Sequence, residues 1–235
     1  MGAIYRREMG AFFTSGLGYV FLTVFYAFSG YFFYTDVLSS KMTDTSPMFV
    51  SMFIIFIFLI PVLTMRLLSE EKKNKTDQGL LTAPISLWEL VLGKFLAAFT
   101  LFVIAESIIF VYAIILKYLG DVVWQTLIGN YVAMLFLGAA FISIGLFVSS
   151  LTENQMTAAV VSFVVMLILY VYDDMFLGRI SNDKVLDVLS ALSFRSRYVE
   201  FTTGVFSAGS ILFFISTAFL FNFFTIKVLE KKRWS

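Results

Sequence analysis

Residues that could carry out catalysis are scarce in this chain of 235 residues, which contains neither His nor Cys. Their absence excludes imidazole bases, thiolate nucleophiles, disulfides and nearly every zinc site. The nearest approach to a phosphate-binding P-loop is Gly93-Lys94-Phe95, which lacks the first glycine and the hydroxyl that would hold Mg²⁺. Tyr172-Asp173 supplies half of the residue pair of an aspartyl intramembrane protease, but no G-x-G-D sequence accompanies it. We therefore expect no catalytic residue, no metal site and no cofactor bound by this chain.

Glu106 is the remaining candidate for chemistry, because it is the one charge near the middle of an apolar stretch, twelve residues from Lys94 and eleven from Lys117. An ionised acid at the centre of a membrane helix costs roughly 2.5–3.5 kcal/mol on insertion scales. One interpretation is a contact for a proton or a substrate. The other is a neutral acid that hydrogen-bonds to Ser, Thr or Asn on a neighbouring helix. The sequence does not separate the two.

The elements that must position these residues are membrane helices, because 60% of the residues are hydrophobic and only 14% are charged, whereas a soluble domain has about 25% charged residues. Six long stretches carry no charge or a single one, and each can cross a hydrocarbon core of roughly 30 Å as a helix. The run 53–60 is apolar on both faces, which argues against a strand barrel. We predict an all-α integral membrane protein in which residues 1–235 form one six-span domain. The expected spans are 17–37, 47–68, 94–117, 126–150, 155–174 and 207–229.

With six spans both chain termini lie on the same side of the membrane, and the distribution of Lys and Arg indicates which side. Eleven of the 17 basic residues lie on the side of the termini and six on the opposite side. The positive-inside rule therefore predicts that both termini are cytoplasmic. The formal net charge is only +1, and no basic run alternates with exposed aromatic residues. We accordingly expect no nucleic-acid partner.

A short amphipathic segment precedes the first span. Tyr5, Met9, Phe12 and Phe13 recur at the spacing of one helical face. This pattern predicts a helix at about 3–14 that lies in the cytoplasmic interface of the lipid bilayer. The alternative is a frayed, solvated N-terminal segment.

The longest cytoplasmic segment runs over residues 66–94 and opens with a dense charge cluster at 70–75. The chain then becomes more apolar, and residues 76–83 predict a short helix. This helix stops at Pro84, because proline disfavours a helical conformation of the residue before it. The segment therefore holds a short helix in the cytoplasm between two spans.

A second helix follows directly, since Ser86 and Glu89 have the spacing of a capping box. The box predicts one helix from near Leu87 to about Lys117. At 1.5 Å per residue this helix is roughly 45 Å long, so its first turns stand outside the bilayer.

The segment between the fifth and sixth spans, about 173–203, is expected on the outer side. Two apolar faces with helical spacing predict two short amphipathic helices there. The first face comprises Val185, Val188, Leu189 and Leu192, and the second comprises Tyr198, Phe201 and Val205.

Small residues recur four positions apart in the fourth and fifth spans. The pairs are Ala139/Ser143, Gly145/Ser149 and Ala158/Ser162. This spacing predicts close helix packing, and the alternative is that the same residues line an interface that moves.

Several stretches of the chain resemble a known family. The sequences LIPVLTMRLLSEEKKNKT at 59–76 and LLTAPISLWELVLGK at 80–94 resemble the coupling region of type-2 ABC exporter permeases. Arg7-Glu8 followed by Phe12-Phe13 and Gly18-Tyr19 is similar to the N-terminal elbow helix of the gliding-motility permease (GldF) subfamily. Residues 229–234 are similar to the C-terminal end of that subfamily. The resemblance covers the whole chain.

This resemblance implies that 76–83 is a coupling helix, which sits in a groove of a cytoplasmic ATPase subunit. It also implies that the elbow helix lies along the membrane and that the outer helices cap the translocation path. The residues implied in ATPase coupling are Glu70, Glu71, Thr76, Asp77, Leu80, Leu81, Thr82 and Pro84.

The resemblance further implies a permease subunit of an ATP-driven exporter in the bacterial inner membrane. ATP and Mg²⁺ would be bound by a separate ABC ATPase dimer. Six spans are half of the usual set, so a second six-span permease is implied, either a different subunit with a large outer domain or a second copy of this chain. Two alternatives stay open: a proton-coupled secondary transporter that uses Glu106, and a membrane scaffold that transports nothing.

Overall fold

The computed structural model describes residues 1–40, 44–76, 79, 85–120, 122–176, 190, 192–202 and 207–234. Every regular element among these residues is a helix. In chain order they are α1 (Gly2–Thr14), α2 (Leu17–Phe32), the π-helical turn η1 (Phe33–Leu38), α3 (Ser46–Thr64), α4 (Arg66–Lys73), α6 (Leu87–Glu106), α7 (Ile108–Leu119), α8 (Trp124–Leu151), α9 (Gln155–Phe176), α11 (Phe194–Thr202) and α12 (Ala208–Trp234).

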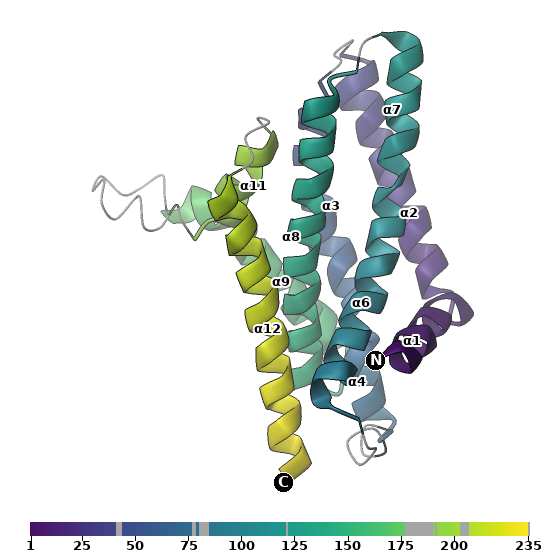
Figure 1. Ribbon diagram of the computed structural model, residues 1–235, viewed down its shortest axis with the longest axis vertical. Coiled ribbons are helices and arrows are strands. Elements are labelled where there is room, and N and C mark those ends of the chain that lie inside the picture. Colours follow the sequence, from purple (N-terminus) through teal and green to yellow (C-terminus); the bar gives the residue numbers. More distant parts are fainter. Residues whose placement is uncertain are drawn as a thin grey trace.

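Six helical stretches within the described ranges are long and apolar enough to cross a membrane. They confirm the predicted all-α integral membrane fold. The stretches are Leu17–Leu38, Ser46–Lys73, Leu87–Leu119, Trp124–Leu151, Gln155–Asp173 and Ala208–Arg233. They form an elongated bundle (Figure 1), and we call the end with α4 and the C-terminal end of α12 the lower end and the opposite end the upper end.

Helix α8 lies at the centre of the bundle and contacts α3, α4, α6, α9, α11 and α12. Small residues let these neighbours approach closely. Gly138 faces Phe102 of α6, and Gly145 faces Thr64 of α3, so closely that a side chain at either glycine would overlap its neighbour. The packing role predicted for Gly145 is therefore confirmed.

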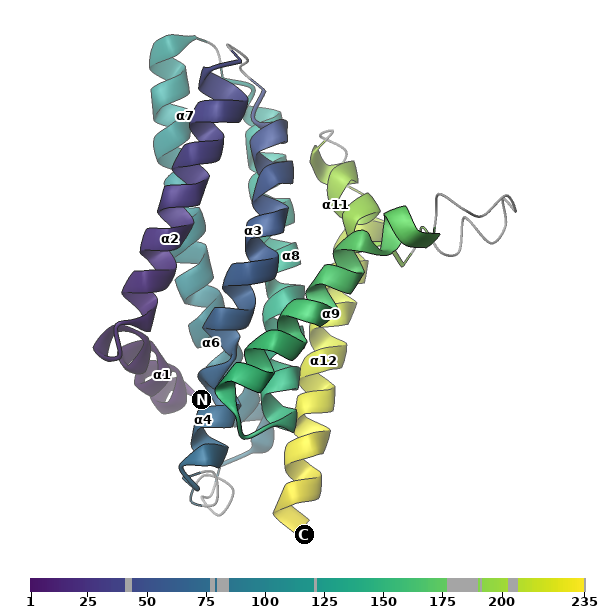
Figure 2. The ribbon, with the colours of Figure 1, turned by 180° about the vertical axis from the view of Figure 1, so that it is seen from behind.

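Helix α1 lies across the lower part of the bundle, as both ribbon views show (Figures 1 and 2). It packs against α6 and α2, which confirms a helix before the first span. The face of α1 that is buried against the bundle comprises Ile4, Glu8 and Phe12, of which only Phe12 belongs to the predicted apolar stripe. Tyr5, Met9 and Phe13, the other residues of that stripe, are half-buried. An acidic residue thus occupies the middle of the buried face.

The predicted single helix from Leu87 to about Lys117 is interrupted. Helix α6 ends at Glu106 and α7 begins at Ile108. Between them the Ser107 hydroxyl donates a hydrogen bond of 2.6 Å to the carbonyl oxygen of Ile104. Serine hydroxyls that bond to the preceding turn compete with the helical backbone pattern, which accounts for the break.

Part of the predicted secondary structure lies outside the described residues. Of the predicted coupling helix at 76–83, the structure describes only Thr76 and Gly79. Most of the first predicted outer helix, 185–192, also lies outside the description. The second predicted outer helix corresponds to α11, which contains Tyr198 and Phe201.

Candidate functional site

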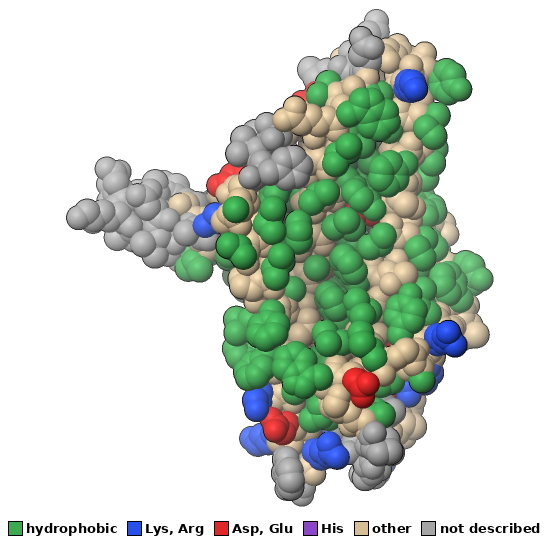
Figure 3. All heavy atoms as spheres, viewed as in Figure 1, with side chains coloured by type: hydrophobic (Ala, Val, Ile, Leu, Met, Phe, Trp, Pro, Cys, Tyr) green, Lys and Arg blue, Asp and Glu red, His purple; other side chains and the backbone are tan. Residues whose placement is uncertain are grey.

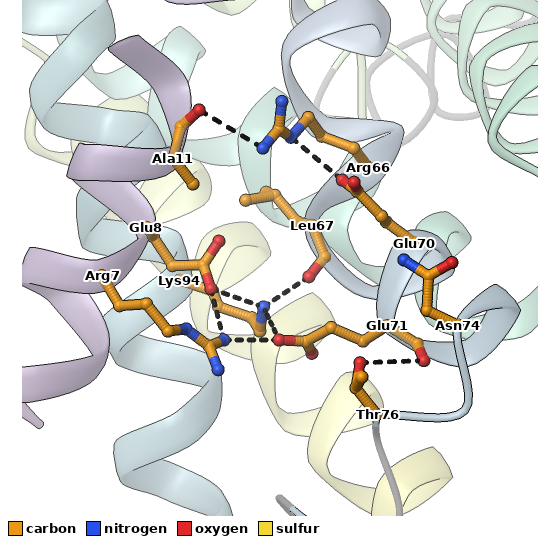
Figure 4. Close-up of a pocket in the computed structure, with 10 residues that line it drawn as sticks. All are labelled: Arg7, Glu8, Ala11, Arg66, Leu67, Glu70, Glu71, Asn74, Thr76 and Lys94. Carbon is orange, nitrogen blue, oxygen red and sulfur yellow. Dashed lines mark hydrogen bonds and ion pairs between the residues drawn. The ribbon is translucent and has the colours of Figure 1, made fainter. Parts of the chain in front are cut away.

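Four charged side chains from three helices meet at the lower end of the bundle (Figure 4). Arg7 and Glu8 come from α1, Glu71 from α4 and Lys94 from α6. The Lys94 Nζ lies 3.0 Å from Glu8 Oε1 and 2.9 Å from Glu71 Oε1. The Arg7 guanidinium pairs with the same two carboxylates, at 2.5 Å from Glu8 Oε1. We call these residues the four-charge cluster.

Lys94 is the buried centre of the cluster, and its side chain is only 1% exposed. A buried ammonium is tolerated only when it is paired and hydrogen-bonded. Besides the two carboxylates, its Nζ donates a hydrogen bond of 2.6 Å to the carbonyl oxygen of Leu67 in α4. Because an ammonium has three hydrogens, these three acceptors satisfy it completely. Lys94 therefore holds α1 and α4 against α6.

The surroundings of Glu8 favour its ionised form. Burial by itself would raise the pKa of the Glu8 carboxyl, but the neighbouring charges of Lys94 and Arg7 and their hydrogen bonds lower it below its ordinary value. Burial acts to lower the pKa of Arg7, and the carboxylates of Glu8 and Glu71 outweigh it, so this pKa is raised. The surroundings therefore favour the charged forms of both Glu8 and Arg7.

Arg66 at the start of α4 makes a second connection to α1. Its guanidinium hydrogen-bonds to the hydroxyl of Ser15 and, at 3.4 Å, to the carbonyl oxygen of Ala11. It lies 5.8 Å from the ring centroid of Phe12 and 3.3 Å from the carboxylate of Glu70. A cation at the C-terminal end of α1 also complements the helix dipole. The middle of α1 and its C-terminal end are thus tied to α4 independently.

A pocket of about 310 Å³ opens beside the cluster (Figure 4). Its charged lining is balanced, with three cations and three carboxylates. Besides the cluster it is lined by Ala11, Arg66, Leu67, Glu70, Asn74 and Thr76. The pocket carries no excess charge with which to attract an ion.

The junction between α3 and α4 is fixed to the central helix by Ser149. Backbone N–H groups of Leu68 and Ser69 both donate hydrogen bonds of 3.1 Å to the Ser149 hydroxyl. That hydroxyl in turn donates a bond of 3.0 Å to the carbonyl oxygen of Met65. A side chain inserted into the backbone ladder bends a helix at a defined point. Helix α4 is thus positioned by α8 as well as by the four-charge cluster.

The residues implied in ATPase coupling divide into three groups. Glu71 points inward, to Lys94 and Arg7, and is not an exposed docking charge. Glu70 is 40% exposed and pairs with Arg66. Thr76 is exposed, and its hydroxyl donates a hydrogen bond of 3.3 Å to the carbonyl oxygen of Glu71. Asp77, Leu80, Leu81, Thr82 and Pro84 lie outside the described residues.

Glu106 lies at the other end of α6, about 18 Å above Lys94 along the helix axis. Its side chain is fully buried. Within the described part of the chain, neither carboxyl oxygen has a hydrogen-bond partner. The predicted bond to Ser, Thr or Asn of a neighbouring helix is therefore not present there.

The sequence did not single out Arg7, Glu8 or Lys94 as site residues. Lys94 is the only charge between Glu89 and Glu106, and a lone cation in such an apolar run indicates a buried, paired group. The distribution of basic residues counts Lys94 on the side of the termini, without assigning it a partner. The predicted capping box is confirmed, because the Glu89 N–H donates to the Ser86 hydroxyl at 3.1 Å and the Ser86 N–H to the Glu89 carboxylate at 3.3 Å.

Comparison with protein families gives the class to which this membrane bundle corresponds. The family model described as ABC-2 family transporter protein matches residues 3–229. The chain belongs to this family. As an ABC-2 family protein it is a membrane-embedded permease component of an ABC transporter, and such a subunit is not itself catalytic. No curated protein has significant similarity to the chain.

Proposed function

We propose that this ABC-2 protein is a six-span permease subunit that couples ATP hydrolysis on a separate subunit to export or mechanical work across the membrane. The observation that supports this role is the four-charge cluster. It joins α4, which precedes the segment 74–86, to α6, which follows that segment. It also attaches α1 to both helices. A force applied to that segment would therefore reach three helices together.

The coupling role of residues 76–83 is part of this proposal. A permease needs a short rigid contact for the ATPase, and Leu80 and Leu81 are the apolar side chains of this segment that suit a groove. Helix α4 makes such a contact effective, because Ser149 of α8 and the four-charge cluster hold it on two sides. Motion of the segment would then tilt α4 and α6 rather than bend the chain locally.

The partners in this proposal are a cytoplasmic ABC ATPase dimer, which binds ATP and Mg²⁺, and a second six-span permease. The second permease is either a different subunit with a large outer domain, as in the gliding-motility subfamily, or a second copy. We place both termini in the cytoplasm of a bacterial cell, with the protein in the inner membrane. Basic side chains gather at the lower end of the bundle (Figure 3), which supports this orientation under the positive-inside rule.

The experiment that tests the proposal is co-purification of the ATPase with a variant of the coupling segment. Truncation of two leucines at a docked interface costs about 2 kcal/mol or more when they are hot spots, a roughly thirtyfold loss of affinity. The double variant Leu80→Ala with Leu81→Ala should therefore lose the ATPase while it still inserts into the membrane. Unchanged co-purification and unchanged transport would contradict the coupling role. The purified chain alone should hydrolyse no ATP.

One observation supports a second candidate function. The buried carboxyl of Glu106 has no hydrogen-bond partner among the described residues, and a proton-coupled transporter would need such an acid. Transport assays in proteoliposomes distinguish an ATP-driven permease from a secondary transporter and from a scaffold. Uptake driven by a pH gradient without ATP would favour the secondary transporter, and normal partner assembly without stimulated ATP hydrolysis would favour a scaffold.

A further inference from the structure

Helix α12 extends further toward the lower end of the bundle than α6 does. Trp88, the second residue of α6, packs on Phe219 and Phe223 of α12, at ring-centroid distances of 6.0 and 6.5 Å. Trp234, the last residue of α12, follows Phe223 by 11 residues, which correspond to about 16 Å along the helix axis. In both ribbon views α12 reaches lower than α6 and α8 (Figures 1 and 2). The lower end of α12 therefore runs past the point at which the segment 74–86 rejoins the bundle.

The central helix α8 gives the same result, because it runs in the same direction as α12. Phe147 of α8 lies against Phe224 of α12, at a ring-centroid distance of 6.0 Å. Helix α8 ends four residues after Phe147, whereas α12 continues for ten residues after Phe224, about 9 Å further. A hydrocarbon core of about 30 Å needs about 20 residues, and α12 has 27. Since α12 begins below the upper ends of α2, α3 and α7 (Figure 1), its excess length lies at the lower end.

Helix α1 marks the level of the membrane surface, because its amphipathic pattern predicts a helix in the interface. It lies beside Gly93 of α6, where an added Cβ would stand 3.0 Å from Ile4. Trp88 is five residues below Gly93, and Lys231 is eight residues below Phe223, which together correspond to about 20 Å. Each headgroup layer is only about 5–8 Å thick. Lys231 therefore lies beyond the lipid headgroups, in the aqueous phase at the lower end.

Two exposed cations at this end of α12 are not used by the fold. Lys231 and Arg233 make no hydrogen bond and no ion pair within the described part of the chain. Lys227, one turn before Lys231, pairs instead with Glu230 at 2.7 Å. Residues 227–233 contain four cations and one carboxylate, which gives a formal net charge of +3. A continuous helix thus presents a basic end to the solvent.

We propose that Lys231 and Arg233 form a second contact with the ATPase subunit, through an acidic surface of that subunit. The contact is separate from the coupling segment 76–83 but lies at the same end of the bundle, since α12 passes the start of α6. The position favours a protein over an anionic lipid, because both cations stand beyond the headgroups. Exposed charges of this kind act mainly on the association rate and its salt dependence. This inference rests on the proposed function, since it assigns a further site to the same partner.

The rate at which the ATPase binds tests this contact. The membrane part of the complex, with the full-length chain, is purified without its ATPase and placed in nanodiscs of phosphatidylcholine, which carry no net charge. The variant is Lys231→Gln with Arg233→Gln. The matched control, Lys117→Gln with Arg6→Gln, also removes one exposed lysine and one exposed arginine. Lys117 lies near the upper end of α7, and Arg6 lies on α1 at the membrane surface.

We expect Lys231→Gln with Arg233→Gln to lower the association rate about threefold or more at low salt. The difference should disappear in about 1 M salt, because salt screens exposed charges. The rate of the control should stay close to that of the parent protein. Equal rates for the variant and the parent, or an equal loss in the control, would overturn the contact. A loss that appears only after phosphatidylglycerol is added would assign the two residues to lipid and would overturn it as well.

The result is separable from that of the leucine experiment. Leu80→Ala with Leu81→Ala should raise the dissociation rate instead, since most changes within an interface act on dissociation. If only the leucine variant differs from the parent, the basic contact is contradicted and the coupling role stands. If only the basic variant differs, the reverse holds. An ATPase that does not bind the parent complex at all would contradict both.

A carbodiimide tests the acidic nature of the partner surface directly. This reagent activates a carboxylate, which then forms an amide bond with an amine in contact with it, with net loss of water. In the complete complex, the Lys231 amine should be joined to an Asp or Glu of the ATPase, and the Lys117 amine should not. The cross-link should weaken in about 1 M salt. A complex in which Lys231 forms no cross-link to the ATPase would overturn the proposal.

Discussion

Lys94 and Glu106 are both charged residue types, both fully buried and both on α6, yet their surroundings are opposite. The Lys94 ammonium has three acceptors from α1 and α4. The Glu106 carboxyl has no hydrogen-bond partner within the described residues. A satisfied buried network specifies one arrangement of its helices, whereas an unsatisfied polar group costs stability wherever it is kept. Lys94 therefore joins three helices near the lower end of α6, whereas Glu106 at its upper end contributes no hydrogen bond among the described residues.

The largest expected effect comes from breaking the joint at Lys94. Lys94→Met leaves the Glu8 and Glu71 carboxylates partly buried beside a single cation, and removal of one partner from a buried ion network costs about 3–5 kcal/mol. We expect a clear loss of thermal stability in detergent. The triple variant Lys94→Met, Glu8→Gln, Glu71→Gln should recover most of it, because no unpaired carboxylate remains. If Lys94→Met alone is as stable as the parent protein, the network does not hold the helices together.

At Glu106 we expect the opposite effect of a substitution on thermal stability. Glu106→Met replaces a carboxyl without hydrogen-bond partners by an apolar side chain of similar length, which removes a penalty of about 1–3 kcal/mol. The melting temperature of the purified protein should stay the same or rise. Glu106→Gln is the polar control and should be no more stable than the parent. A melting temperature that falls in Glu106→Met would mean that the carboxyl has a stabilising partner.

The contrast between Lys94 and Glu106 also shows which features of the structure can be predicted from the sequence. Apolar run length predicted six membrane helices, and the spacing of Ser86 and Glu89 predicted the start of α6. Such features are local, so one sequence contains them. The partners of Lys94 lie 86 and 23 residues away, at Glu8 and Glu71, and helical periodicity carries no information about such pairs. The burial of Glu8 in α1 could not be predicted for the same reason.

We expect low pH to weaken the contact of α1 with α4 and α6. The pKa of Glu8 is lowered from an ordinary value of 4.5 by its cationic neighbours, so its contribution to stability is present above pH 4.5 and is lost as the pH falls through the folded-state pKa. A spin label on Gly10→Cys, an exposed site of α1 with open space around it, reports this change. Its mobility should increase below pH 4.5. With Glu8→Gln the pH dependence should become weaker, and an unchanged profile would exclude Glu8 as its cause.

The smallest effect is expected at Glu70, the neighbour of Glu71 in sequence. Its pair with Arg66 is exposed on the Glu70 side, and such pairs contribute about 0–1 kcal/mol that salt screens. Glu70→Lys should therefore change thermal stability slightly and less at high salt. Glu71→Lys, which places a cation beside Lys94 and Arg7, should lower it far more at any salt concentration. Equal effects of the two reversals would remove the distinction between the inward and the exposed carboxylate.

The central claim is that the four-charge cluster makes α4 and α6 move as one unit when ATP is hydrolysed. It is tested most directly by the distance between spin labels at Lys73→Cys, the last residue of α4, and Trp88→Cys, an exposed residue near the start of α6. The measurement is made on the complete complex, without nucleotide and in an ATP-trapped state. We expect the same narrow distance distribution in both states, and a distribution that broadens or shifts with nucleotide once Glu71→Gln is added. A distance that changes with nucleotide in the otherwise unaltered complex, to the same extent as with Glu71→Gln, would contradict the claim.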